Sequence, residues 1–122
     1  MEWIYVGIGS FIGGVLRYWI SFPLNSRYGD SIPWGTLLVN FVGCLIIGIL
    51  YSESNKIQLP PRIFLLATTG VLGGFTTFST FSLEAIDILQ SGQVTQGVVY
   101  VLLSLGSCLI GTFLGMTLMR LY

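Results

Sequence analysis

Four long apolar stretches, separated by short polar segments, are the feature that most constrains how this chain can fold. They run over residues 3–22, 33–51, 62–89 and 97–119. A helix that crosses a bilayer needs about 20 mostly apolar residues. Four crossings therefore use almost all of the 122 residues, and we predict an all-α membrane protein with a single domain over residues 1–122.

The scarcity of charge supports this prediction. Only 8% of the residues are charged, whereas 53% are hydrophobic, and soluble domains carry about a quarter charged residues. The lipid bilayer is thus an expected partner, and nucleic acid is not. The N-terminal Met1 and Glu2 lack the basic region of a secretory signal, so we expect the first stretch to be retained.

The basic residues outside the stretches give a weak orientation signal. Four crossings put Lys56, Arg62 and Arg120 on one side of the membrane, and Arg27 on the other with Arg17 nearer the membrane. The positive-inside rule needs a clear excess on one side. We therefore predict insertion in both orientations, for which an antiparallel homodimer is the natural assembly.

The third stretch combines glycines with hydroxyl and aromatic residues. Gly73 and Gly74 each weaken a helix by about 1 kcal/mol relative to alanine, and the β-branched Thr76 and Thr77 follow. We predict a helix broken at mid-membrane and buried between other helices, where its freed backbone groups can bind ions. Glycine pairs at 9–13, 70–74 and 111–115 predict close helix packing.

Side chains after the predicted break suit a small anion. Phe78 and Phe81 share one helix face, Ser79 and Ser82 line an adjacent face, and Thr80 lies between them. Because an aromatic ring has a positive edge, two ring edges can solvate an anion. Packing of both rings in the core is the alternative.

Polar residues in the other stretches also have two interpretations. Arg17 either reaches toward the headgroups or draws anions to a pore mouth. Asn40 either bonds to another helix or offers an anion an amide donor. Glu84 and Asp87 either form an interfacial cap or tune an ion vestibule.

A weakly polar stripe follows the fourth stretch. Tyr100, Ser104, Cys108 and Thr112 recur every four residues, so they either pair with another helix or line a path with hydroxyl donors. We expect Cys44 and Cys108 to be buried as small apolar groups. The chain has no histidine and shows no nucleophile–base pair or metal cluster, so an enzyme is not expected.

Three sequence blocks resemble the CrcB/Fluc family of fluoride channels, and the likeness covers essentially the whole chain. They are GGVLRY at 13–18, WGTLLVNFVG at 34–43 and GGFTTFSTFS at 73–82, the last followed by Glu84. The resemblance implies a dual-topology dimer with two antiparallel pores. It also implies passive export of fluoride from the cytoplasm across a prokaryotic inner membrane.

The resemblance further implies roles for individual residues. Phe78 and Phe81 would contact fluoride beside the Asn40 donor, and the backbone carbonyls of Gly73 and Thr76 would bind a structural sodium ion at the dimer centre. The remaining pathway residues would be Arg17, Ser79, Thr80, Ser82, Tyr100, Ser104 and Thr112. Cys108 stands where a hydroxyl is expected in the fourth-helix track.

Two other functions fit four short spans. A small multidrug-resistance transporter needs a carboxylate buried in the first span, where this chain has Arg17. A non-transporting scaffold subunit would conduct no ions when purified.

Overall fold

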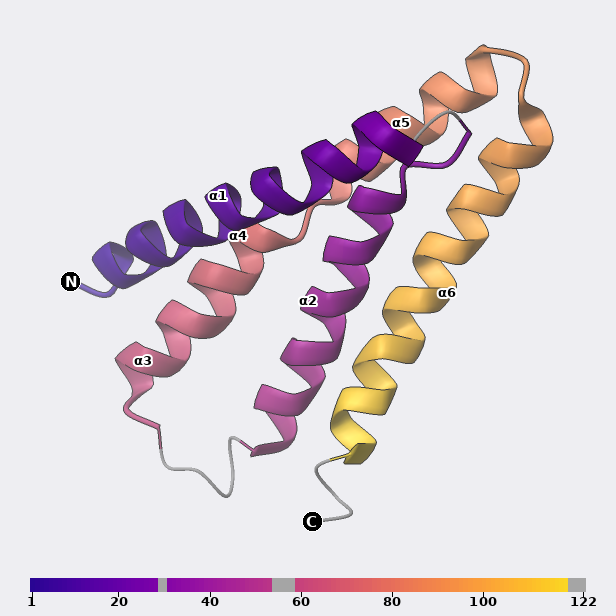
Figure 1. Ribbon diagram of the computed structural model, residues 1–122. Helices are drawn as coiled ribbons and strands as arrows, with labels where there is room; N and C mark the ends of the chain where they lie inside the picture. Colours follow the sequence, from indigo (N-terminus) through magenta and orange to yellow (C-terminus); the bar gives the residue numbers. More distant parts are fainter. Residues whose placement is uncertain (29–30, 54–58, 119–122) are drawn as a thin grey trace.

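A computed structural model describes residues 1–28, 31–53 and 59–118, and every regular element among them is a helix (Figure 1). Four stretches are long and apolar enough to cross a membrane, which confirms the predicted number of spans for the described residues. The elements are α1 (Trp3–Tyr28), α2 (Trp34–Glu53), α3 (Pro61–Leu65), the π-helical η1 (Leu66–Leu72), α4 (Gly73–Phe75), α5 (Phe78–Gln90) and α6 (Val94–Leu118).

The first helix is longer than the sequence predicts. The stretch predicted from the sequence ends at residue 22, just before the helix-breaking Pro23, but α1 continues to Tyr28 with Pro23 inside. A proline within a helix costs one backbone hydrogen bond and adds a clash. Here the turn of α1 that follows Pro23 is stabilised by α2, because Asn25 Oδ1 accepts a 2.7 Å hydrogen bond from the Gly35 N–H. Tertiary contacts of Asn25 thus oppose the local cost of Pro23.

The third span is helical on both sides of two extended residues. Thr76 has φ −87° and ψ 155°, and Thr77 has φ −149° and ψ 117°. The span nevertheless bends by only 16°, so its two halves run nearly in line. The predicted break at mid-membrane therefore stays a prediction. What the structure contains is an interruption of two extended residues, Thr76 and Thr77. The π turn of η1 was not predicted.

Glycines set how closely the helices pack. A Cβ added to Gly9 would lie 2.6 Å from the Leu66 carbonyl oxygen, and one added to Gly13 would lie 2.8 Å from the Phe75 nitrogen. On the other side of α2, a Cβ on Gly115 would lie 2.9 Å from the Ile49 nitrogen. These contacts confirm the close packing predicted from the glycine pairs at 9–13 and 111–115.

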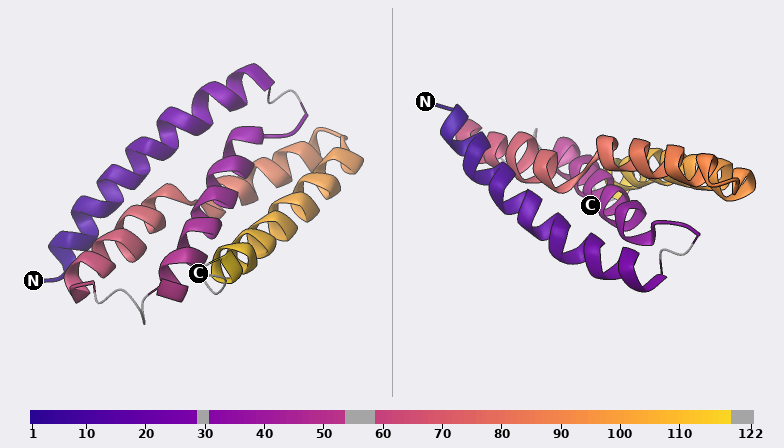
Figure 2. Two further views of the ribbon diagram at one scale, coloured as in Figure 1. Left: turned by 60° about the horizontal axis from the view of Figure 1, so that its bottom comes forward. Right: turned by 90° about the horizontal axis from the view of Figure 1, so that it is seen from above.

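Helix α2 lies at the centre of the molecule. Figures 1 and 2 show α1 and the α3–α4 segment on one side of α2, with α6 beside it on the other and running in the same direction. Many apolar side chains outside this packing are exposed, among them Phe11 (73%) and Leu109 (74%), as a lipid-facing surface requires. Lys56 and Arg120, used in the orientation argument, lie outside the described residues.

Candidate functional site

The interruption of the third span is clamped by Asn40 of α2. Asn40 Oδ1 accepts a 2.7 Å hydrogen bond from the Thr77 N–H, and Asn40 Nδ2 donates a 3.0 Å bond to the Thr77 carbonyl. Both residues are buried, each with 8% exposure. An unpaired backbone group buried this way costs free energy comparable to a lost hydrogen bond. Asn40 therefore removes the free-energy cost of leaving the Thr77 backbone groups unpaired at the interruption.

The same clamp frees two carbonyl groups. In an unbroken α-helix the Thr77 N–H would donate to the Gly73 carbonyl, but it donates to Asn40 instead. The Thr80 N–H would donate to the Thr76 carbonyl, but it donates to the Thr77 hydroxyl at 3.2 Å. Thr77 thus caps α5, and the carbonyls of Gly73 and Thr76 are left without their α-helical donors.

A cavity of about 230 Å³ lies beside the interruption, between α2, α5 and α6. We call it the aromatic cavity, after the two phenyl rings in its lining. Ser104 Oγ, at 4% residue exposure, has no hydrogen-bond partner among the described residues. The cavity is lined by Asn40, Cys44, Thr76, Thr77, Phe78, Phe81, Ser104, Leu105 and Cys108.

The two phenyl rings occupy different surroundings. Their centroids lie 5.3 Å apart at an interplanar angle of 57°, a tilted arrangement that presents an edge of one ring toward the other. Phe81 is 7% exposed and packs on Tyr100, with 5.4 Å between centroids. Phe78 is 71% exposed. The predicted pair therefore shares a cavity wall, while of the two only Phe81 belongs to the core of this chain.

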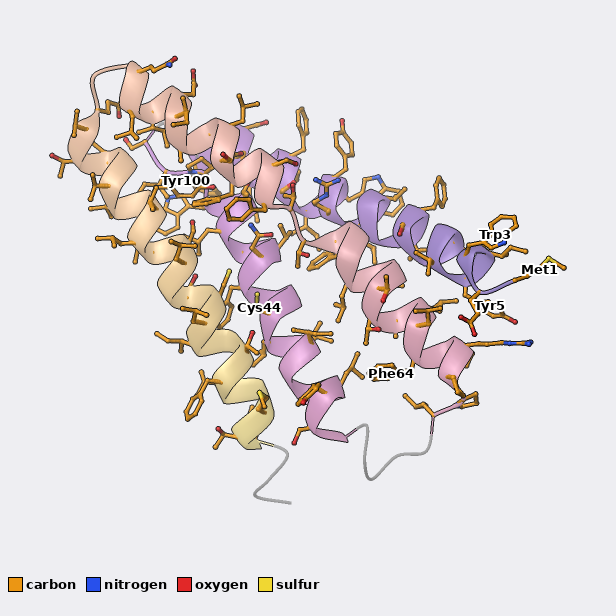
Figure 3. The ribbon with its side chains drawn as sticks, turned by 180° about the vertical axis from the view of Figure 1, so that it is seen from behind. Met1, Trp3, Tyr5, Cys44, Phe64 and Tyr100 are labelled. Carbon is orange, nitrogen blue, oxygen red and sulfur yellow. The ribbon has the colours of Figure 1, made fainter. Side chains whose placement is uncertain are left out.

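Glu84 joins all four spans at one point. Its Oε2 accepts a 2.7 Å hydrogen bond from the Tyr100 hydroxyl, and its Oε1 accepts bonds from Thr36 Oγ1 at 2.8 Å and Asn25 Nδ2 at 3.2 Å. Figure 3 shows Tyr100 on α6 directed at the junction of α2 and α5. Glu84 is thus neither an exposed cap nor directed into the aromatic cavity: it is a half-buried acceptor for three donors.

A second cavity, of about 300 Å³, is lined by Arg17 of α1. Arg17 is half-buried, and its Nε has no hydrogen-bond partner among the described residues. Thr77 borders both this cavity and the aromatic cavity. We call it the arginine cavity; its lining is Arg17, Tyr18, Ser21, Phe22, Asn25, Thr36, Thr77 and Thr80.

A third cavity, of about 230 Å³, brings together the two predicted sodium ligands. Gly73 is exposed, and a Cβ added to it would meet no atom closer than 3.9 Å. The position is therefore open on the outer face of the span. We call it the glycine cavity, lined by Gly43, Cys44, Ile47, Thr68, Leu72, Gly73 and Thr76.

The structure gathers some of the predicted site residues and separates others. Asn40, Phe78, Phe81 and Ser104 meet in the aromatic cavity, and Arg17 and Thr80 meet in the arginine cavity. Ser79 and Ser82 are exposed, the Tyr100 hydroxyl is bound to Glu84, and Thr112 lines none of the three cavities.

Sequence reasoning missed the connections made by Asn25, Thr36 and Thr77. Thr77 follows a glycine pair and precedes a helix, which is a recognisable N-cap position. Asn25 and Thr36 gave no such signal, because their common partner Glu84 is 59 and 48 residues away.

The chemistry of the aromatic and arginine cavities favours an anion. Their linings offer amide and hydroxyl donors, ring edges and one guanidinium, and none of the lining residues is acidic. A carboxylate is present nearby in Glu84, but its acceptors are occupied by three donors. Fold and site together define a multi-span helical membrane protein with anion-compatible cavities between its helices.

Comparison with known proteins gives the family. Residues 4–116 match the family described as CrcB-like protein, Camphor Resistance (CrcB), and the chain belongs to that family. It is 42% identical over 118 residues to the fluoride-specific ion channel FluC of Rhizobium meliloti, covering 96% of this chain and 94% of the relative. The protein of the same name from Clostridium perfringens is 40% identical, with 97% and 93% covered.

Proposed function

We propose that this chain is a fluoride-selective channel that lets fluoride leave a prokaryotic cytoplasm passively across the inner membrane. The observation that carries the proposal is the aromatic cavity, where the Asn40 amide, the Ser104 hydroxyl and the two phenyl rings meet beside the interrupted span. Relatives named as fluoride-specific channels, matching over nearly their whole length, support the choice of ion.

Selectivity in this mechanism comes from replacing water. A small anion holds its hydration shell tightly, and a pore must offer substitute ligands at close range. Asn40 Nδ2 has two hydrogens and uses one for the Thr77 carbonyl, which leaves one for the ion. The Ser104 hydroxyl and the edges of Phe78 and Phe81 would complete the set.

Arg17 would raise the local concentration of anions in the arginine cavity. Thr80 contributes a hydroxyl to that cavity, and Thr77 borders both cavities. An ion would therefore pass the Thr77 side chain on its way to the phenyl pair. Tyr100 would act by fixing Glu84 and supporting the Phe81 ring, and Thr112 would extend the track on α6.

A second, inverted copy of the chain would complete the pathway. Phe78, Ser79 and Ser82 are all exposed on α5, although an anion route needs them shielded from lipid. An antiparallel homodimer would cover this face and create two equivalent pores. The weak bias of basic residues between the two sides supports insertion in both orientations.

The freed carbonyls suit a structural sodium ion at the centre of such a dimer. The Thr77 and Thr80 N–H groups bond elsewhere, so the Gly73 and Thr76 carbonyl oxygens are available as the hard ligands that such cations prefer. Two copies would contribute four oxygens. When bound, sodium would supply fixed positive charge that holds the two interrupted spans together.

Fluoride efflux from liposomes that contain only this protein tests the proposal, with chloride efflux as the control. We expect rapid fluoride efflux and little chloride efflux, whereas a scaffold subunit would give neither. Replacing Phe78 and Phe81 together by isoleucine should abolish flux and leave the dimer folded. The matched control is the same change at the exposed Phe11 and Phe113, which should retain flux. Undiminished flux in the first variant would refute the aromatic role.

A further inference from the structure

The only two cysteines of the chain face each other across α2 and α6. These helices run in parallel (Figure 1), and a Cβ added to Gly48 would clash with the Thr112 carbonyl oxygen. One helical turn earlier on each helix stand Cys44 and Cys108. Both cysteines border the same cavity between these helices, and Figure 3 shows Cys44 between the two helices.

The thiol pair belongs to the wall of the aromatic cavity. Both residues line it together with Phe78 and Phe81, and Cys44 also lines the glycine cavity. Both cysteines are half-buried, and neither is in a disulfide. The proposed conduction mechanism uses neither sulfur atom, so it assigns no role to the two cysteines in this wall.

Two thiols on the wall of one cavity offer the kind of ligands that a soft metal ion prefers. Thiolates favour ions such as Cu⁺ over hard cations, and d¹⁰ ions of this class accept two sulfur ligands. A structural zinc site needs four ligands, and the described residues contain no group of three or more histidine, cysteine or acidic side chains able to hold a metal. The pair therefore fits a two-coordinate ion and not a tetrahedral one.

We propose that Cys44 and Cys108 form a two-sulfur site for one soft d¹⁰ metal ion in the wall of the aromatic cavity. On binding, each thiol releases its proton to solvent and each sulfur forms one bond to the metal, with no change in oxidation state. The ion would stand beside the phenyl pair in a cavity of about 230 Å³. It would narrow the route at the phenyl pair.

Binding of Hg²⁺ to the purified full-length protein tests the site without reference to transport. Hg²⁺ per chain is measured by native mass spectrometry, and metal–sulfur bonding by ultraviolet absorption, against increasing 2-mercaptoethanol. The variants are Cys44→Ser, Cys108→Ser and the double change, which removes every thiol of the chain.

We expect the unaltered protein to keep one Hg²⁺ per chain. It should do so at a monothiol concentration at least about tenfold above that which strips either single variant, because the second sulfur is held at high effective concentration. The double variant should bind none. Two Hg²⁺ per chain, or equal retention by the single variants, would overturn the proposal.

The position of the site in the ion route rests on the proposed function and needs a second measurement. Fluoride efflux is compared with and without Hg²⁺, each variant being normalised to its own flux without metal. We expect strong inhibition of the unaltered protein, reversal by a dithiol, and no inhibition of the double variant. Chelation without inhibition would remove the site from the route. Absence of fluoride efflux in every sample would instead refute the proposed function, while the binding result stands.

Discussion

The two halves of the third span are held in place by opposite means. The half from Pro61 to Phe75 lies against α1 where Gly9 and Gly13 carry no side chain, and its contacts there are largely with backbone atoms. The half from Phe78 to Gln90 is held by named polar partners, above all the three donors to Glu84. The first half is positioned by close backbone packing at glycines, and the second half by hydrogen bonds between specific side chains. Substitutions should therefore act differently on each side of Thr76 and Thr77.

The largest effect is expected from Glu84→Leu. The change leaves the Tyr100 and Thr36 hydroxyls without their acceptor and removes one of the two acceptors of Asn25 Nδ2, and each unsatisfied buried donor costs about 1–3 kcal/mol. We expect a loss of roughly 3–5 kcal/mol in the free energy of unfolding, measured by denaturant titration in detergent. Asp87→Leu is the matched control at an exposed acid one turn away and should change stability by less than about 0.5 kcal/mol. Equal effects would show that the network does not hold α5.

Asn40→Leu should come next. It leaves the N–H and the carbonyl of Thr77 unpaired, for a loss of roughly 2–4 kcal/mol on the basis of two unsatisfied groups. Asn40→Asp keeps an acceptor for the N–H but loses the donor to the carbonyl, so its stability should fall between the two. The same unfolding titration measures all three proteins. If Asn40→Leu were as stable as the unaltered chain, the clamp would not be needed.

Gly13→Ala tests the close packing of α1 against the first half of the third span. Its new Cβ would meet the Val71 carbonyl and lie 2.8 Å from the Phe75 nitrogen, and overpacking of this kind costs about 1–3 kcal/mol. Gly14→Ala is the matched control, because a Cβ there meets nothing within 4 Å. Thermal unfolding in detergent should separate the two variants. Equal melting temperatures would mean that α1 can move away from the third span without loss.

The smallest expected effect on stability is the difference between substitutions of Phe78 and of Phe81. Phe81→Leu should cost roughly 1–2 kcal/mol, because its ring is 7% exposed and removing buried atoms leaves space that the surroundings only partly fill. Phe78→Leu should cost less in an unfolding titration of the monomer, because that ring is 71% exposed. A reversed order would place Phe78 in the core and contradict the description of α5.

Local patterns in the sequence predicted much of this molecule. Apolar length gave the four spans, and paired glycines gave the close packing of α1 and α6. The polar Asn40 in an apolar helix signalled that a partner must exist, but its spacing gave no means of identifying Thr77. Pro23 misled because its local cost is opposed by Asn25, whose partners come from other helices. The partners of Glu84 could not be predicted for the same reason: they come from distant segments of the chain.

The π turn of η1 decides which residues of the third span face the glycine cavity. The Gly73 N–H donates to the Thr68 carbonyl, five residues back, and both residues line the glycine cavity. In a regular α-helix, positions five apart diverge by about 140° around the axis. Regular α-helical winding through the same residues would therefore turn Thr68 away from the cavity face that Gly73 lines. The π turn thus lets two residues that are five apart in the sequence line one wall of the glycine cavity.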